Sequence, residues 1–185
     1  PLGVPTVEDK LVQMALKKIL EAIYEPHFIE GSYGFRPGKS AHQALNAVDK
    51  ALLTHPVNAV VEVDIARFFD TVDHQKLMDV LRVRIADSRV LRLIGRCLRA
   101  GVLAEGGWQP TPQGTPQGSV LSPVLANIYL DHVLDQWFLR TVQPAQKGYA
   151  QLIRYRHPHS LQQAFQRVTG QLRTPVRHAT PQGYL

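Results

Sequence analysis

The sequence contains a single cysteine, Cys97, and no apolar run that is long enough to cross a lipid bilayer. One cysteine excludes an internal disulfide framework and is typical of a reducing compartment, so Cys97 is expected to be a buried structural thiol. Without a signal peptide or a membrane span, the sequence predicts a soluble, cytoplasmic protein. Hydrophobic residues make up 44% of the 185 residues, which excludes a disordered chain and suffices for one globular domain.

Acidic residues are absent after Asp135, so that residues 151–185 carry five arginines and no compensating acid. Lysine and arginine side chains displace counterions from phosphates, and a net charge of +6 therefore suggests a polyanionic partner. Because most of this excess lies in 151–185, the composition alone is weak support for a nucleic acid.

Local patterns predict both helices and strands. Capping residues Thr6, Ser40, Asp73 and Ser88 predict helices over about 7–25, 41–54, 74–87 and 89–100, and longer helical spacing follows over 119–140. Strands are predicted over 58–65 and 150–155, and a hairpin around Gly106-Gly107. An amphipathic helix is predicted over 160–172, and no pattern that could pack follows Arg173. The first helix is expected to bury Leu11, Ala15, Leu16, Ile19, Leu20 and Ile23.

Asp64 lies at the end of the predicted strand 58–65, and Phe68-Phe69-Asp70 follows it. A carboxylate at the end of an apolar strand is costly unless something binds it. Carboxylate oxygens suit Mg²⁺, which would neutralise a triphosphate. An ordinary cap or surface aspartate explains the same pattern, and Asp70 and Asp73 are more simply explained as turn and cap residues.

Two glycine-rich loops are further candidates for ligand contact. The loop 114–119 leads into a helix, so its backbone could approach a flat ligand. The loop 33–39 presents Arg36 and Lys39, whose charges suit phosphate oxygens. Both loops could equally be ordinary connections. A run of arginines could follow a phosphate backbone, although a solvated helix face explains such runs more often; it comprises Arg82, Arg84, Arg89, Arg92, Arg96 and Arg99.

Four segments of the sequence occur in a fixed order. They are Pro1-Leu2-Gly3-Val4-Pro5-Thr6, Gly31-Ser32-Tyr33-Gly34-Phe35-Arg36-Pro37-Gly38, Val63-Asp64-Ile65 with Phe68-Phe69-Asp70, and Thr115-Pro116-Gln117-Gly118-Ser119-Val120-Leu121-Ser122-Pro123. Over about residues 1–155 the chain resembles the reverse transcriptases (RNA-directed DNA polymerases) encoded by group II introns. The resemblance implies an α+β, right-hand polymerase fold that is partial, with fingers in 1–57, part of the palm in 58–172, a disordered tail in 173–185 and no thumb. The first residues look like a start in the middle of something larger.

The resemblance also implies roles for individual residues. Asp64 is implied as the catalytic, Mg²⁺-binding aspartate, and Phe68 or Phe69 as the ring that screens against a ribose 2′-hydroxyl. The implied nucleotide-binding set is Lys10, Arg36, Phe68, Phe69, Gln117 and Gly118, and the implied template contacts are Lys39, Thr115 and Pro116. The implied reaction is RNA-templated addition of deoxynucleotides by two-metal phosphoryl transfer, with deoxynucleoside triphosphates and template or intron RNA as partners.

The chain departs from this family directly after Tyr155. The family's strand runs into Ala-Asp-Asp-Phe, whose carboxylates complete the metal site, whereas Arg156-His157-Pro158-His159 follows here. One carboxylate cannot hold two Mg²⁺ ions about 4 Å apart, and imidazole is a poor Mg²⁺ ligand. We therefore expect an inactive reverse transcriptase fragment that does not bind Mg²⁺ in catalytic form. The alternatives are a non-enzymatic, maturase-like remnant that binds intron RNA, an enzyme that takes its acids from another chain, and an unrelated metal hydrolase, for which the sequence has no His and acid cluster.

Overall fold

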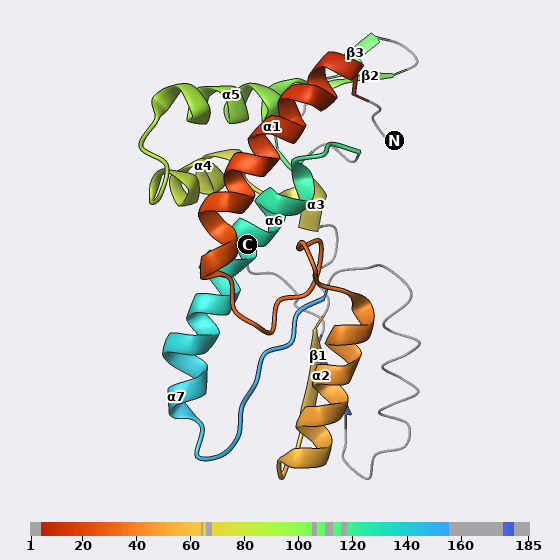
Figure 1. Cartoon of the computed structure of the whole chain (residues 1–185), viewed down its shortest axis with the longest axis vertical. Helices are drawn as coiled ribbons and strands as arrows, with labels where there is room; N and C mark the ends of the chain where they lie inside the picture. Colours follow the sequence, from red (N-terminus) through yellow and green to blue (C-terminus); the bar gives the residue numbers. More distant parts are fainter. Residues whose placement is uncertain are drawn as a thin grey trace. The chain divides into compact units, whose positions relative to one another are not determined.

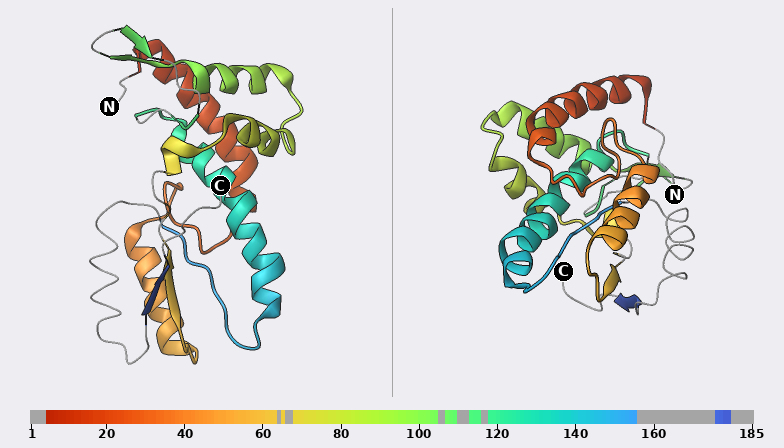
Figure 2. Two further views of the ribbon diagram at one scale, coloured as in Figure 1. Left: turned by 180° about the vertical axis from the view of Figure 1, so that it is seen from behind. Right: turned by 60° about the horizontal axis from the view of Figure 1, so that its bottom comes forward.

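The computed structural model describes residues 5–63, 65, 68–104, 107–109, 113–115, 118–155 and 176–179. The chain divides into two compact units (Figures 1 and 2), the first from Pro1–Phe28 and Arg67–Val133, the second from Ile29–Ala66 and Leu134–Leu185. These units do not coincide with the predicted boundary between 57 and 58, so the division into fingers and palm remains a prediction. The described residues are helix-rich with short strands, which is compatible with the predicted α+β class.

The first unit is built mainly of helices. In it α1 (Val7–Tyr24) is followed by the short helix η1 (Glu25–His27), and α3 (Phe68–Thr71), α4 (His74–Arg82), α5 (Ser88–Arg99) and α6 (Ser122–Leu130) come later in the chain. Helix α1 packs on α5 and α6, and α4 also packs on both (Figure 1). Their shared core contains the fully buried side chains Leu20, Leu77, Leu81, Ile94, Leu98, Leu121, Leu125 and Ile128.

Helix α1 buries a different face from the predicted one. Leu16 and Leu20 are buried as expected, but Leu11 is 63% exposed and Ile19 is 44% exposed. Gln13 turns inwards instead, because its side-chain oxygen accepts hydrogen bonds from the Ser119 hydroxyl at 3.1 Å and the Val120 N–H at 3.0 Å. A pattern of apolar residues cannot predict the burial of a polar side chain that forms hydrogen bonds in the interior.

Helix starts were largely predictable from local capping. Thr6 accepts from the Asp9 N–H, Asp73 accepts from the Lys76 N–H, and Ser40 forms a capping box at the start of α2 (Ala41–Thr54). The prediction that Ser88 caps α5 was wrong, because the side chain of Asp87 accepts the Arg89 N–H at 2.7 Å. None of the described helices combines the length and apolar character that a membrane span requires.

The hairpin and the long helix follow their predicted positions with shifted ends. Strands β2 (Val102–Ala104) and β3 (Gly107–Gln109) pair in antiparallel register, which confirms the hairpin. The helix predicted from 119 begins at Ser122 as α6. It continues through the π-helical turns η2 (Asp131–Asp135) and η3 (Phe138–Val142) into α7 (Gln143–Ala145).

The second unit contains a two-stranded parallel sheet. Strand β1 (Val60–Val63) pairs with β4 (Val176–Ala179), so that Val60 lies opposite Val176. Strand β4 lies within 173–185, and the disordered tail expected there remains a prediction. Of residues 150–155, predicted as a strand, Arg154 alone takes part in a β-bridge with the described residues, the parallel bridge to Ser32. The helix predicted over 160–172 lies outside the described residues.

Candidate functional site

Two motifs that are distant in the sequence meet in the first unit. Helix α3 carries Phe69, whose carbonyl accepts the N–H of Thr115 at 2.6 Å. The N–H of Gly114 donates to the carbonyl of Val72 at 2.7 Å. These backbone bonds fix the start of the glycine-rich loop against the segment that follows the predicted metal-binding aspartate.

Gly114 allows this close approach because it has no side chain. Its φ is +82°, in the left-handed region, and a Cβ atom there would lie 2.6 Å from the Phe69 carbonyl oxygen and 2.7 Å from that of Asp70. His74, the first residue of α4, adds a hydrogen bond from Nε2 to the Gly114 carbonyl. A larger residue at position 114 would therefore separate the two motifs.

The two adjacent phenylalanines have different environments. Phe68 is 3% exposed, and its ring centroid lies 6.1 Å from those of both Phe69 and Tyr129. Phe69 is partly exposed and adjoins Thr115. Phe68 is thus a core residue, and Phe69 is the ring of the pair that can meet a ligand.

Thr115 has a buried hydroxyl that is unpaired among the residues the structure describes. The residue is 4% exposed, and its hydroxyl forms no hydrogen bond with the residues that the structure describes. Buried hydroxyls are normally paired, so this one is suited to a solvent molecule or a bound ligand. Sequence reasoning proposed Thr115 for a template contact without any indication of its burial.

The basic residues of loop 33–39 contact neighbouring groups of the second unit. One nitrogen of Arg36, Nη1, donates to the carbonyls of Ile29 at 2.9 Å and Ser32 at 2.8 Å. Lys39 Nζ lies 5.1 Å from the ring centroid of Tyr33, in cation–π geometry. These contacts give Arg36 a structural role in its own loop, while contact of either residue with phosphate remains a prediction.

A buried ion pair in the second unit was missed by the sequence analysis. Arg154 donates from Nε to Asp135 Oδ1 at 3.1 Å and from Nη2 to Oδ2 at 2.8 Å. Its backbone accepts the Tyr33 N–H at 2.8 Å and donates to the Gly31 carbonyl at 2.7 Å. Arg154 therefore links the long helix to loop 33–39. The available signal was an arginine flanked by the apolar residues Ile153 and Tyr155.

The remaining predicted site residues are dispersed. Lys10 is exposed on α1, and Gly118 is exposed with a φ of +99°. Asp64, Pro116 and Gln117 lie outside the described residues. In the first unit the described part of the site consequently consists of the Phe69–Thr115 junction, while Arg36 and Lys39 belong to the second unit.

Among the described residues, the side-chain donors do not form a site for a pair of Mg²⁺ ions. No group of three His, Cys, Asp or Glu side chains within the described ranges could hold a metal ion. The carboxylate of Asp73 caps α4, and the hydrogen bond from the Lys76 N–H lowers the pKa of Asp73. Asp135 is already bonded to Arg154, and no acid follows it. Asp64 would thus lack the partner carboxylates that a two-metal site requires.

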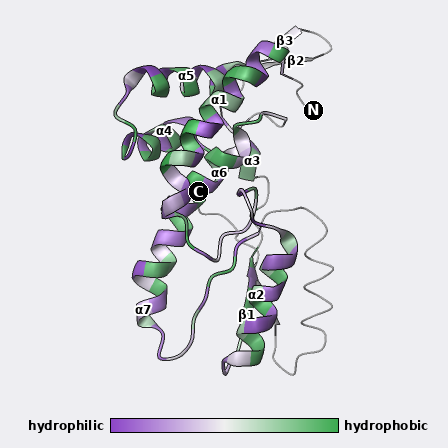
Figure 3. Cartoon of the chain, in the orientation of Figure 1, coloured by the Kyte–Doolittle hydropathy of each residue, from purple (hydrophilic) through white to green (hydrophobic). Residues whose placement is uncertain are grey.

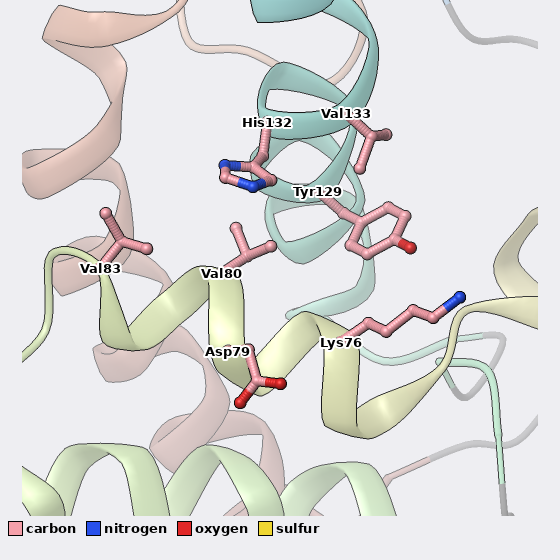
Figure 4. Close-up of a pocket in the computed structure, with 7 residues that line it drawn as sticks. All are labelled: Lys76, Asp79, Val80, Val83, Tyr129, His132 and Val133. Carbon is pink, nitrogen blue, oxygen red and sulfur yellow. The ribbon is translucent and has the colours of Figure 1, made fainter.

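A groove of about 400 Å³ also lies in the first unit, between α4 and the helix that contains α6 and η2 (Figure 4). Its walls are formed by Lys76, Asp79, Val80, Val83, Tyr129, His132 and Val133. Tyr129 connects the groove to the site, because its ring also packs against Phe68. No residue assigned to the site by sequence lines the groove, so we assign no ligand to it.

Comparison with known proteins identifies relatives across most of the chain. Residues 1–173 match the family described as "Reverse transcriptase (RNA-dependent DNA polymerase)". The chain is 45% identical over 140 residues to the group II intron-encoded protein LtrA of Lactococcus lactis subsp. cremoris, covering 76% of this chain and 23% of that protein. Identity to protein YkfC of Escherichia coli (strain K12) is 40% over 141 residues, covering 74% of this chain and 36% of YkfC. Nuclear intron maturase 4, mitochondrial, of Arabidopsis thaliana is 31% identical over 144 residues, 75% of this chain and 17% of the maturase. The chain thus spans a minor part of each relative.

Proposed function

This chain belongs to the reverse transcriptase (RNA-dependent DNA polymerase) family, in its group II intron-encoded type, and from this premise we propose that it is a fingers-and-palm part that binds RNA without adding deoxynucleotides. The right-hand polymerase architecture, with fingers in 1–57 and part of the palm in 58–172, belongs to this proposal.

The backbone bond between Thr115 and Phe69 is the observation that carries the proposal. It supports a single surface on which the glycine-rich loop and Phe69 face the same ligand. Because Phe68 is buried and Phe69 is partly exposed, we propose Phe69 as the ring that meets the sugar of an incoming deoxynucleotide. Gln117 and Gly118 would lie against the nucleotide, and Thr115 and Pro116 against the template.

Basic residues would supply contacts with phosphate. Lys10 is exposed and carries no ion pair with the described residues, which supports a role in holding a triphosphate. The resemblance gives Arg36 the same role, and its Nη1 is bonded to the carbonyls of Ile29 and Ser32. Lys39 is placed by Tyr33 and would contact the RNA backbone.

Catalysis is not expected from this chain alone. In two-metal phosphoryl transfer the ions stabilise the attacking and leaving oxygens, and several carboxylates must hold them. Asp64 is the one acid that the resemblance assigns to this task here, and no acid follows Asp135. RNA binding, which needs phosphate contacts and no metal pair, does not depend on the missing carboxylates.

The test is incorporation of dTTP on a poly(rA)/oligo(dT) template with Mg²⁺, with the chain compared with Asp64→Ala and with an active reverse transcriptase as positive control. We expect no incorporation from either chain, together with salt-dependent binding of the template. Incorporation that disappears in Asp64→Ala would overturn the proposal, because the missing carboxylates would then come from elsewhere. Absence of RNA binding would overturn the part of the proposal that assigns RNA binding to this chain.

A further inference from the structure

Helix α5 has one buried face and one strongly basic face. Ile94 and Leu98 are almost fully buried where the helix packs on α1 and α4. The exposed side carries an arginine row, defined here as Arg89, Arg92, Arg96 and Arg99. Their spacing of three, four and three residues places them on one side of the helix, and hydrophilic and hydrophobic residues alternate along α5 in Figure 3. Packing of the apolar face thus fixes the direction in which the row points.

The stability of the helix does not explain the arginine row. Arg89 lies in the first turn, where the helix dipole disfavours a cation, and Arg92 and Arg96 are like charges four residues apart. Arg96 and Arg99 lie in the last turn, where cations do suit the dipole, so only these two have a structural explanation. Each pair of neighbouring arginines repels, and an external anion would relieve that repulsion.

Within the described residues, a neighbouring acid pairs with one arginine of the row, Arg89, and with none of the other three. Residues 88–99 contain no acid, and Arg89 lies 3.6 Å from the cap residue Asp87 with its side chain 88% exposed. Within the described residues, no carboxylate forms an ion pair with the other three arginines of the row.

The two arginines at the end of α4 differ from the row. Arg82 pairs with Asp79, and Arg84 donates to His27 Nε2 at 3.0 Å. Of the six arginines of the run, Arg82, Arg84 and Arg89 thus have a partner within the described residues. No ion pair of Arg92, Arg96 or Arg99 is found there, and all three are exposed. A Cβ at Gly95 would lie 3.2 Å from Arg99 Nη2, so the Arg99 side chain folds back along the helix surface.

We propose that the arginine row binds the phosphate backbone of base-paired RNA. From Arg89 to Arg99 the row extends about 15 Å along the helix, a length over which a nucleic-acid duplex presents several phosphates. Four guanidinium groups on a rigid helix suit regularly spaced phosphates, and each can bind two phosphate oxygens. This inference rests on the proposed RNA-binding function and assigns it a surface separate from the Phe69–Thr115 junction.

The test measures the salt dependence of binding to a fluorescein-labelled RNA hairpin by fluorescence anisotropy. The row variant is R89Q/R92Q/R96Q/R99Q, and the control variant K18Q/K50Q/R140Q/K147Q removes the same charge from other exposed positions. For the row variant we expect the slope of log affinity against log salt to fall by about 0.9 per lost phosphate contact, roughly 3 to 4 in total, and the affinity at low salt to fall at least about tenfold. The control should lose much less.

Circular dichroism and thermal unfolding separate binding from folding. Because the row consists of repelling charges, the row variant should keep its helix content and unfold at the same or a higher temperature. A second variant, R89K/R92K/R96K/R99K, keeps the charge and should retain most of the slope of log affinity against log salt. This variant can still be compared with the original chain if the glutamine variant does not fold.

Three outcomes would overturn the inference. A folded row variant with the affinity and slope of the original chain would exclude the row as the binding surface, while the proposed RNA-binding function would stand. Tighter binding to a DNA duplex of the same sequence, with the same loss in the row variant, would show that RNA is the wrong ligand. An original chain that does not bind the hairpin would refute the proposed RNA binding itself, and the inference with it.

Discussion

Removal of one partner of the Asp135–Arg154 pair is expected to destabilise the second unit strongly. In Arg154→Met the Asp135 carboxylate, which is 0% exposed, would remain buried without its guanidinium partner. Breaking a buried pair in this way costs about 3–5 kcal/mol. Replacement of both residues by apolar ones, Asp135→Leu with Arg154→Met, leaves no unpaired charge, and its cost should lie within about 1 kcal/mol of zero.

The geometry of the Asp135–Arg154 pair supports a large loss of stability when the pair is broken. The two hydrogen bonds of 3.1 and 2.8 Å use both carboxylate oxygens, and the Arg154 side chain is only 9% exposed, so solvent screening is small. The exposed pair of Arg82 and Asp79, with side chains 51% and 59% exposed, is a matched control. Its coupling in a double-mutant cycle should stay below about 1 kcal/mol.

Urea denaturation monitored by tryptophan fluorescence measures these energies. Trp137 lies two residues after Asp135 in the second unit, and a Trp108→Phe background leaves it as the only tryptophan. A loss below about 1 kcal/mol in Arg154→Met would refute the reasoning, because it would mean that water already solvates the pair. A double variant as unstable as the sum of the two single variants would also refute it, since the residues would then be uncoupled.

Three further predictions concern the first unit. Gly114→Ala should lower the free energy of unfolding and weaken template binding. In Gly107→Ala the added Cβ would meet nothing within 4 Å, so this variant should lose only the stability that left-handed backbone strain costs, about 1–2 kcal/mol. Denaturation of each variant measures both losses. The bond from the Lys76 N–H lowers the pKa of Asp73, so the stability that Asp73 gives α4 is fully present above its unfolded pKa and is lost as the pH falls through the lower, folded pKa. Acid titration of helicity should show this loss, and Asp73→Asn should remove that part of the pH dependence. Burial raises the pKa of Cys97, so iodoacetamide should alkylate the folded chain more slowly at neutral pH than the urea-unfolded chain, as followed by mass spectrometry.

Local features of the fold were predictable from sequence, and non-local ones were not. The caps at Thr6, Ser40 and Asp73 depend on residues within one turn, and the structure confirms all three. The inward turn of Gln13 depends on Ser119 and Val120, far away in the chain, and periodicity could not reveal it. Strand β4 was not predicted for the same reason, since it pairs with β1, which is distant in the sequence.

The site shows the same division. Sequence motifs selected Phe68 and Phe69 together, and only the tertiary packing of Phe68 on Tyr129 separates a core ring from one that can meet a ligand. The motif also selected Arg36 for its charge, but not its bonds to Ile29 and Ser32, because backbone carbonyls are acceptors at every residue and leave no trace in sequence.

The motif loops are held by contacts that do not involve the missing carboxylates. Gly114 and Thr115 are fixed through backbone bonds to Val72 and Phe69, and loop 33–39 is joined through the backbone of Arg154. A chain without the acid pair can therefore keep the geometry of these loops, since none of these backbone bonds needs a metal ion or a second aspartate. The geometry of these loops thus does not depend on the carboxylates that catalysis needs. For this reason RNA binding and nucleotide addition should be tested as independent properties of this chain.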